Sequence, residues 1–214
     1  MKEPSLRITA IWLAVATAAV LIAMVAVGMA TGATQELHEH FMLPGDYALA
    51  LQQHASGLRV LIALDIAFLV LYTAFFVALA GYLSGRPFVR IALAAMIATA
   101  VLDIIEDHHI LAMLNAANHE VVPNATFILL QEVESATKFS MSYLGLVLFG
   151  LAIPRTTKLA IALALFLVVG TLIGAVIAYA VPPSTAASFA SGQWVGFLVG
   201  LALAVAWLRQ SPEA

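Results

Sequence analysis

The chain has 214 residues, of which 63% are hydrophobic and 10% are charged, with a mean hydropathy of +1.03 and a formal net charge of −3. A soluble domain has about 45–50% apolar and about 25% charged residues, so this composition excludes a soluble globule and predicts an all-α integral membrane protein. The absence of cysteine excludes disulfides and thiolate metal sites, and no basic cluster predicts binding to nucleic acid.

Six apolar segments are long enough to cross about 30 Å of hydrocarbon as helices. They predict a six-transmembrane-helix bundle that forms one domain over residues 1–214, with a long outer loop over residues 31–57. The first run is too long for the apolar core of a signal peptide, so we expect it to be a retained span. In chain order the predicted spans are residues 8–30, 58–83, 88–114, 127–151, 159–181 and 189–208.

Lysine and arginine predict the orientation of the bundle, because they are enriched in cytoplasmic loops. Seven of the nine basic residues fall on one side of the predicted spans: Lys2, Arg7, Arg86, Arg90, Arg155, Lys158 and Arg209. Both termini are therefore predicted to be cytoplasmic, in what we expect to be a bacterial inner membrane. Ten of the twelve acidic residues and all six histidines then lie in the outer half.

The outer loop contains the tract Glu36-Leu37-His38-Glu39-His40, whose side chains are able to bind a metal ion. Residues 47–55 form either a short interfacial helix or an extension of the second span that bends at Gly57. The sequence leaves open whether His38, His40 and His54 cover a site beneath the loop.

Asp65 interrupts an otherwise apolar stretch of the second span. An ionisable group at membrane depth costs roughly 2.5–3.5 kcal/mol on insertion scales, so it indicates a functional site. Tyr72 follows seven residues later and shares the same helix face.

The third span ends in a dense group of ionisable residues. Asp103-x-x-Glu106-x-x-His109 places three potential ligands along one side of a helix, and Glu-x-x-His spacing is used by di-metal carboxylate bundles. We therefore predict Asp103, Glu106 and His109 as ligands of a divalent metal, either zinc, manganese or iron. The alternative is a set of helix-end residues near the lipid headgroups, which suits His108 and Asp107 best.

The fourth span contains the deepest basic residue, Lys138. It should face the bundle and pair with an acid, either Glu134 four residues earlier or Asp103. We predict Asp65, Glu134 and Lys138 as catalytic residues, although a purely structural Glu134–Lys138 pair is the alternative.

The fifth and sixth spans carry no charge. Their glycines predict small-residue faces for close helix packing, which favours a scaffold inside one chain over the seam of a homo-oligomer. Gln193 and Trp194 lie near the outer end of the last span, where Trp194 suits an interfacial belt. The glycines concerned are Gly170, Gly174, Gly192, Gly196 and Gly200.

These features favour a metal-binding membrane protein, with metal-dependent chemistry on a lipid, lipid-linked or small molecule that enters from the outer leaflet. One carboxylate would act as general base on a metal-bound water. Two alternatives stay open: a proton- or cation-coupled transporter, or a non-catalytic membrane protein of interaction or assembly. No His-Glu-x-x-His, Gly-x-Ser-x-Gly or phosphate-loop motif is present.

Overall fold

The structure is a computed structural model that describes residues 3–180 and 186–210, and every regular element in these ranges is helical. The prediction of an all-α protein is therefore confirmed for the described residues. Lys2, which entered the prediction of orientation, and residue 181 at the end of the fifth predicted span lie outside them. The elements are α1 (Glu3–Thr31), η1 (Glu36–Glu39), α2 (Pro44–Gln53), α3 (Ala55–Tyr82), α4 (Val89–Asn118), α5 (Ala125–Ala152), α6 (Lys158–Leu165), η2 (Phe166–Gly170), α7 (Thr171–Ala180) and α8 (Ala186–Gln210).

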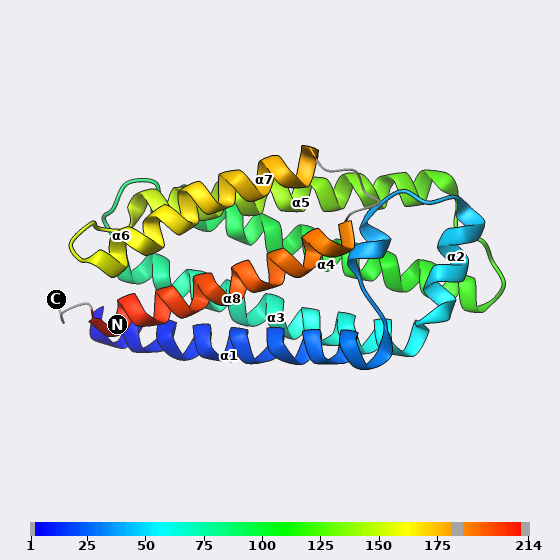
Figure 1. The fold of residues 1–214 in the computed structure, drawn as a ribbon, viewed down its shortest axis with the longest axis horizontal. Helices are drawn as coiled ribbons and strands as arrows, with labels where there is room; N and C mark the ends of the chain where they lie inside the picture. The colour runs from blue at the N-terminus through cyan, green and yellow to red at the C-terminus, as the bar shows by residue number, and fades with distance from the viewer. Residues whose placement is uncertain (1–2, 181–185, 211–214) are drawn as a thin grey trace.

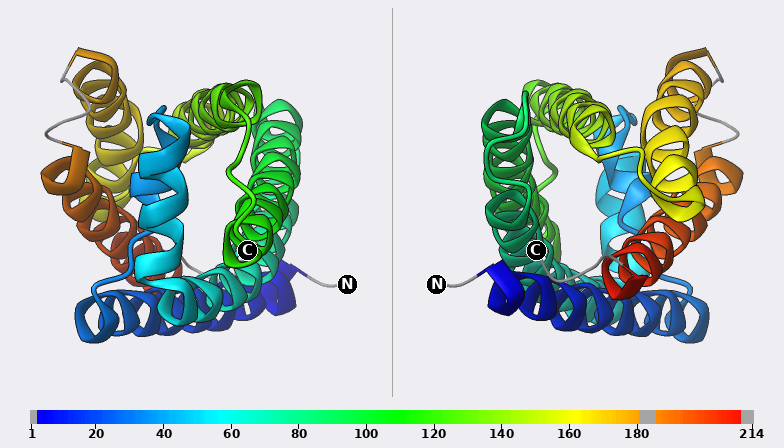
Figure 2. Two further views of the ribbon diagram at one scale, coloured as in Figure 1. Left: turned by 90° about the vertical axis from the view of Figure 1, so that its right-hand side faces the viewer. Right: turned by 90° about the vertical axis from the view of Figure 1, so that its left-hand side faces the viewer.

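The long helices run side by side and form a closed ring (Figures 1 and 2). Around this ring, α1 packs against α3, α3 against α4, and α4 against α5. The continuous rod of α6, η2 and α7 follows α5, and α8 closes the ring against α6 and α1. The short helix α2 crosses one end of the bundle, which we call the outer end. The first turn of α1 and the last turn of α8 lie at the opposite end (Figure 1).

Four helical stretches are long and apolar enough to cross a membrane: residues 5–31, 55–82, 158–180 and 193–210. They are the features of an integral membrane protein, as the composition predicts. α4 and α5 have 30 and 28 residues and are as long as these spans, but they hold most of the buried ionisable residues. The count of six spans and the cytoplasmic placement of the termini therefore stay predictions.

The chain between α1 and α3 contains a short separate helix, so residues 47–55 do not simply extend the second span. Its position at the membrane interface stays a prediction. α1 ends at Gly32, whose φ of +69° is a left-handed conformation typical of a helix C-terminus. Pro44 then occupies the start of α2, where its missing N–H is not needed. His54 interrupts the helix with φ −124° and ψ 27°, and α3 begins at the next residue.

Two apolar clusters fill the bundle, and a polar layer separates them. The inner cluster includes Phe68 on α3, Ala100 on α4 and Phe149 on α5. The outer cluster lies beneath α2 and includes Ile62 on α3 and Ile110 on α4. On α3 and α4, the acidic residues fall between these positions at helical spacing, so they face the same interior as the two cores.

Candidate functional site

The central turns of three helices carry the side chains of the polar layer. Asp65 comes from α3, Asp103 from α4 and Lys138 from α5, and all three side chains are buried. Asp103 lies half-way along the 30 residues of α4, and Lys138 lies half-way along the 28 residues of α5. With a rise of about 1.5 Å per residue, each is roughly 20 Å from either end of its helix. The layer is therefore deeper than a helix-end cluster would be.

Lys138 is the centre of this layer. Its ammonium nitrogen Nζ lies 2.5 Å from a carboxylate oxygen of Glu106, 3.0 Å from one of Asp103 and 3.2 Å from one of Glu39. Only 5% of Lys138 is exposed, so the pairing must compensate a large loss of hydration. The predicted partner Asp103 is correct. The predicted partner Glu134 is wrong, because Glu134 turns towards His109.

Hydroxyl and amide groups bind two further carboxylate oxygens. Ser135 donates a hydrogen bond to Oε1 of Glu106 at 2.6 Å. Gln35, in the loop before η1, donates to Oδ1 of Asp107 at 2.6 Å. Asp107 is fully buried, so it pairs with a neighbour and is not in contact with water. Among the described residues, Oδ2 of Asp107 and both amide atoms of Gln131 have no hydrogen-bond partner.

The loop around η1 covers the outer side of the layer. Glu39 reaches Lys138, and Glu36 accepts a hydrogen bond of 2.5 Å from Nε1 of Trp194 on α8. The ring of His38 is buried edge-on against Tyr47, whose hydroxyl donates to the His38 carbonyl at 3.1 Å. The loop is therefore part of the site.

The three histidines of the loop are placed differently. His38 is buried, His40 is half-buried, and Nδ1 of His54 lies 3.1 Å from the Thr31 carbonyl oxygen. Only His38 is held inside the covering loop, and it faces Tyr47 rather than the carboxylates. The metal-capable tract of the sequence therefore contributes Glu36 and Glu39 to the site, and its His38 packs against Tyr47.

Burial changes the acidity of these loop residues. Loss of hydration raises the pKa of Glu39 to about 8, although Lys138 acts in the opposite direction. Burial, with a smaller contribution from His54, lowers the pKa of His38 to about 4. His38 is therefore neutral at physiological pH, and Glu39 exchanges its proton near neutrality.

The three predicted metal ligands do not converge on one point. Asp103 and Glu106 meet at Nζ of Lys138, which occupies the space between them. His109 is directed elsewhere, with Nδ1 3.0 Å from Oε2 of Glu134 in a partly exposed pair. Within residues 3–180 and 186–210, no group of three or more histidine, aspartate and glutamate side chains is placed to hold a metal ion.

A cavity of about 80 Å³ opens beside Lys138; we call it the polar cavity because several charged side chains line it, although most of its walls are apolar. It is lined by Asp65, Asp103 and Lys138, by Glu36 and Glu39 from the loop, and by several aromatic rings. The predicted residues Asp65, Asp103 and Lys138 therefore face one space.

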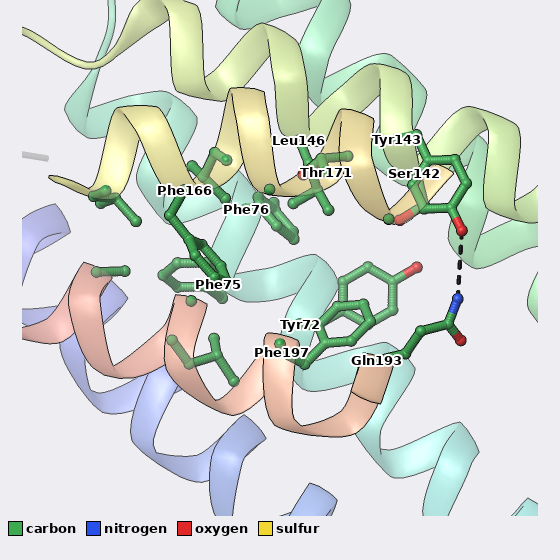
Figure 3. A pocket seen from close by; sticks show the side chains of 18 of the residues that line it. Tyr72, Phe75, Phe76, Ser142, Tyr143, Leu146, Phe166, Thr171, Gln193 and Phe197 are labelled. Carbon is green, nitrogen blue, oxygen red and sulfur yellow. Dashed lines mark hydrogen bonds between the residues drawn. The ribbon is translucent and has the colours of Figure 1, made fainter. Parts of the chain in front are cut away.

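A second, apolar cavity of about 260 Å³ lies next to the polar one on the side of the inner end of the bundle. Figure 3 shows its aromatic lining and the 3.3 Å hydrogen bond from Gln193 to the Tyr143 hydroxyl. Its α3 side is closed by buried side chains, whereas its lining on η2, on α7 and on α8 from Gln193 to Gly200 is half-buried or exposed. Six residues line both cavities: Phe68, Tyr72, Phe139, Ser142, Gln193 and Phe197.

Glycine and an irregular helix give the apolar cavity its width. A Cβ atom added at Gly174 or Gly196 would meet no other atom within 4 Å, so these glycines face open space. The expectation of close helix packing is wrong for both, whereas the glycine at position 192 lies outside the residues whose side-chain surroundings are described. The π-helical turn η2 contributes Phe166 and Gly170 to the lining, and such turns are frequent at functional sites.

Polar members of the site that the sequence did not single out include the buried Gln35 and Thr99. Another is the half-buried Tyr143, whose hydroxyl accepts the hydrogen bond from Gln193. Thr99 precedes Asp103 by one helical turn, so its position on the same face was readable from spacing. Gln35 lies in an irregular loop, where no periodicity indicates which side chains turn inwards.

A comparison of the chain with protein-family models, curated proteins and solved structures finds no match.

Proposed function

We propose that this protein binds an amphipathic molecule taken from the surrounding membrane. The observation that carries the proposal is the pair of adjoining cavities, in which an apolar space of about 260 Å³ shares six lining residues with a space of about 80 Å³ that carboxylates and Lys138 line in part. Ligand sites are typically apolar cavities with a few convergent polar groups. This arrangement supports the lipid or lipid-linked ligand that the sequence predicts.

Each part of the site has its own role in this proposal. Aromatic side chains such as Phe75, Phe76 and Phe166 line the space for the apolar part of the ligand. Asp65 and the Lys138 cluster contact its polar part, and the loop with Glu39 separates that part from the outer solution. The half-buried lining on η2 and α8 is the side on which the ligand enters from the lipid.

A variant that fills the apolar cavity tests this proposal. Gly196→Leu places a side chain in open space, and Gly45→Leu is the control because Gly45 also has no neighbour within 4 Å but lies exposed on α2. Protein purified in mild detergent is extracted, and the bound molecules are identified by mass spectrometry. We expect the wild type and Gly45→Leu to retain one molecule that Gly196→Leu loses. Equal retention by all three proteins contradicts the proposal.

Metal binding by Asp103, Glu106 and His109 is a separate proposal with less support. A metal ion between Asp103 and Glu106 requires Lys138 to move away, and His109 has to leave Glu134. Elemental analysis of untagged wild type beside Glu106→Ala/His109→Ala tests it. A stoichiometric metal that the double variant lacks supports metal binding.

Coupled transport is the second candidate, and the excess of buried carboxylates over basic residues favours it. Five acidic residues are buried around one lysine: Glu39, Asp65, Asp103, Glu106 and Asp107. Proton relays in membrane proteins are commonly built from buried acids of this kind. Flux of the bound molecule into liposomes, driven by a pH gradient and abolished by Asp65→Asn, supports transport. Binding without flux contradicts transport and leaves a receptor or other binding protein.

A further inference from the structure

We infer that the ligand of this site is a hydrophobic cation, with an ammonium-like group in the polar cavity against Asp65 and its apolar part in the aromatic cavity. The inference rests on the proposed function and adds the charge of the ligand. It follows from four observations: the saturation of Lys138, the excess of acid, an unpartnered hydroxyl at the junction of the cavities, and the aromatic rings around it.

Lys138 has no free donor for an anionic headgroup. An ammonium group has three N–H bonds, and three carboxylates lie within 3.2 Å of its nitrogen. A phosphate or carboxylate ligand would therefore have to displace one of these partners. It would also approach the acidic groups that remain, at a high electrostatic cost.

The polar cavity contains more acid than base. Asp65, Asp103, Glu36 and Glu39 line it together with a single basic residue, Lys138. Among the described residues, Asp65 has no basic side chain within 4 Å, although it is only 7% exposed. A buried carboxylate needs either a proton or a cation, and a cationic ligand supplies the second.

The hydroxyl of Tyr72 marks the junction of the two cavities and points to a ligand independently of the acids. Tyr72 is only 5% exposed, lines both cavities, and its hydroxyl has no hydrogen-bond partner among the described residues. A buried hydroxyl without a partner is costly. A bound molecule that passes from one cavity into the other would contact it.

The aromatic rings at this junction suit a cation better than a neutral headgroup. Phe68, Phe197 and Trp194 line the polar cavity beside Asp65, and the rings of Phe68 and Phe197 meet edge to face at 6.0 Å. The faces of aromatic rings attract ammonium groups, and the attraction grows when water is excluded. Acidic and aromatic side chains together are the surroundings that a hydrophobic ammonium ion requires.

Two hydrophobic ions of the same shape and opposite charge provide the test. Tetraphenylphosphonium and tetraphenylborate are titrated calorimetrically into wild type in a non-ionic detergent. We expect the phosphonium to bind and to release protons from the acids, which is detected by repeating the titration in buffers of different ionisation enthalpy. We expect the borate not to bind. Borate binding as tight as phosphonium binding overturns the inference.

Asp65→Asn, with Asp46→Asn on the exposed part of α2 as control, locates the cation. Phosphonium binding should weaken about tenfold or more in Asp65→Asn and stay unchanged in Asp46→Asn; unchanged binding in Asp65→Asn overturns the inference. Should Asp65→Asn not fold, the charge preference and proton release of wild type decide alone.

Gly196→Leu separates the two proposals. If both ions bind equally and Gly196→Leu abolishes both, the cavity binds amphipathic molecules without a preference for charge, so only the inference fails. If phosphonium binds and Gly196→Leu has no effect, the apolar cavity is not the site, and both proposals fail.

Discussion

The polar layer and the apolar cavity beneath it share helices α3 and α5, yet they differ in how many of their side-chain atoms have a close partner. In the layer, Lys138 is surrounded by Glu106, Asp103 and Glu39 at distances of 2.5–3.2 Å. In the cavity, Gly174 and Gly196 face space in which an added methyl group would touch nothing.

This difference follows from the cost of burying each kind of group. A charge inside a membrane protein requires a partner at close range, so the layer tolerates little movement. Apolar walls require no particular partner, so a cavity between them persists and accepts molecules of varied shape. The layer therefore restricts how the helices pack against one another, and in the proposed function the cavity provides the room for a ligand.

Among the variants that test this difference, Lys138→Met is expected to lose the most stability. Removal of the lysine leaves Glu39, Asp103 and Glu106 buried without a cation, which destabilises a protein by about 3–5 kcal/mol. The thermal unfolding midpoint in mild detergent measures the loss. Lys158→Met is the control, because Lys158 is exposed at the start of α6 and should change the midpoint little. A small, equal change in both variants would show that the layer is not a stabilising network.

A pair of glycine variants tests the difference in packing. Gly57→Ala places a Cβ atom 2.5 Å from Oγ1 of Thr31 and 2.9 Å from Cβ of Ala33, and such overpacking costs about 1–3 kcal/mol. Gly196→Ala adds the same methyl group to open space and should not lower stability. Unfolding midpoints of the two variants are compared directly. An equal loss in both would mean that the cavity walls are as tightly packed as the α1–α3 contact.

The sequence predicts the helices well because long apolar runs have few alternatives in a membrane. It also predicts the burial of Asp65 and the pairing of Lys138 with Asp103, because the spacing along each helix places them on interior faces. It does not predict which neighbouring side chain meets each residue. Glu134 is four residues from Lys138 on α5, but Lys138 contacts Glu39 from a loop 99 residues away.

Two other features depend on tertiary structure in the same way. In the sequence, Asp107 lies near the end of the third predicted span. In the structure, Gln35 from the outer loop donates a hydrogen bond to it. Small residues such as Gly196 are compatible with close helix packing and with an open cavity, because the absence of a side chain allows either a neighbouring helix or empty space beside the backbone. The depth and shape of the site are therefore readable only once the helices are assembled.

The pH dependence of stability tests the role of Glu39. Its folded-state pKa of about 8 lies above its ordinary value, so between these values the folded protein binds a proton that the unfolded chain has released. Stability therefore falls as pH rises through this window, by at most about 1.4 kcal/mol per pH unit for one proton.

Glu39→Gln removes this contribution, so its unfolding midpoint should rise relative to wild type between about pH 5 and 8 and then level off. Lys138 on α5, Asp103 and Glu106 on α4 and Glu36 on η1 face Glu39 in both proteins, and their own titrations largely cancel in the comparison. A difference between the two proteins that does not change with pH would show that Glu39 is not titrating in the folded state.

The smallest loss of stability is expected from His109→Gln. This variant tests whether His109 belongs to the polar layer. His109 and Glu134 form a pair whose side chains are 19% and 17% exposed, and pairs in contact with solvent contribute about 0–1 kcal/mol. His38→Gln is the comparison, since His38 is buried against Tyr47 and should lose more stability. If His109→Gln instead approaches the loss of Lys138→Met, His109 belongs to the same network as Asp103 and Glu106. That result would restore the three residues as a common site, as a metal centre requires.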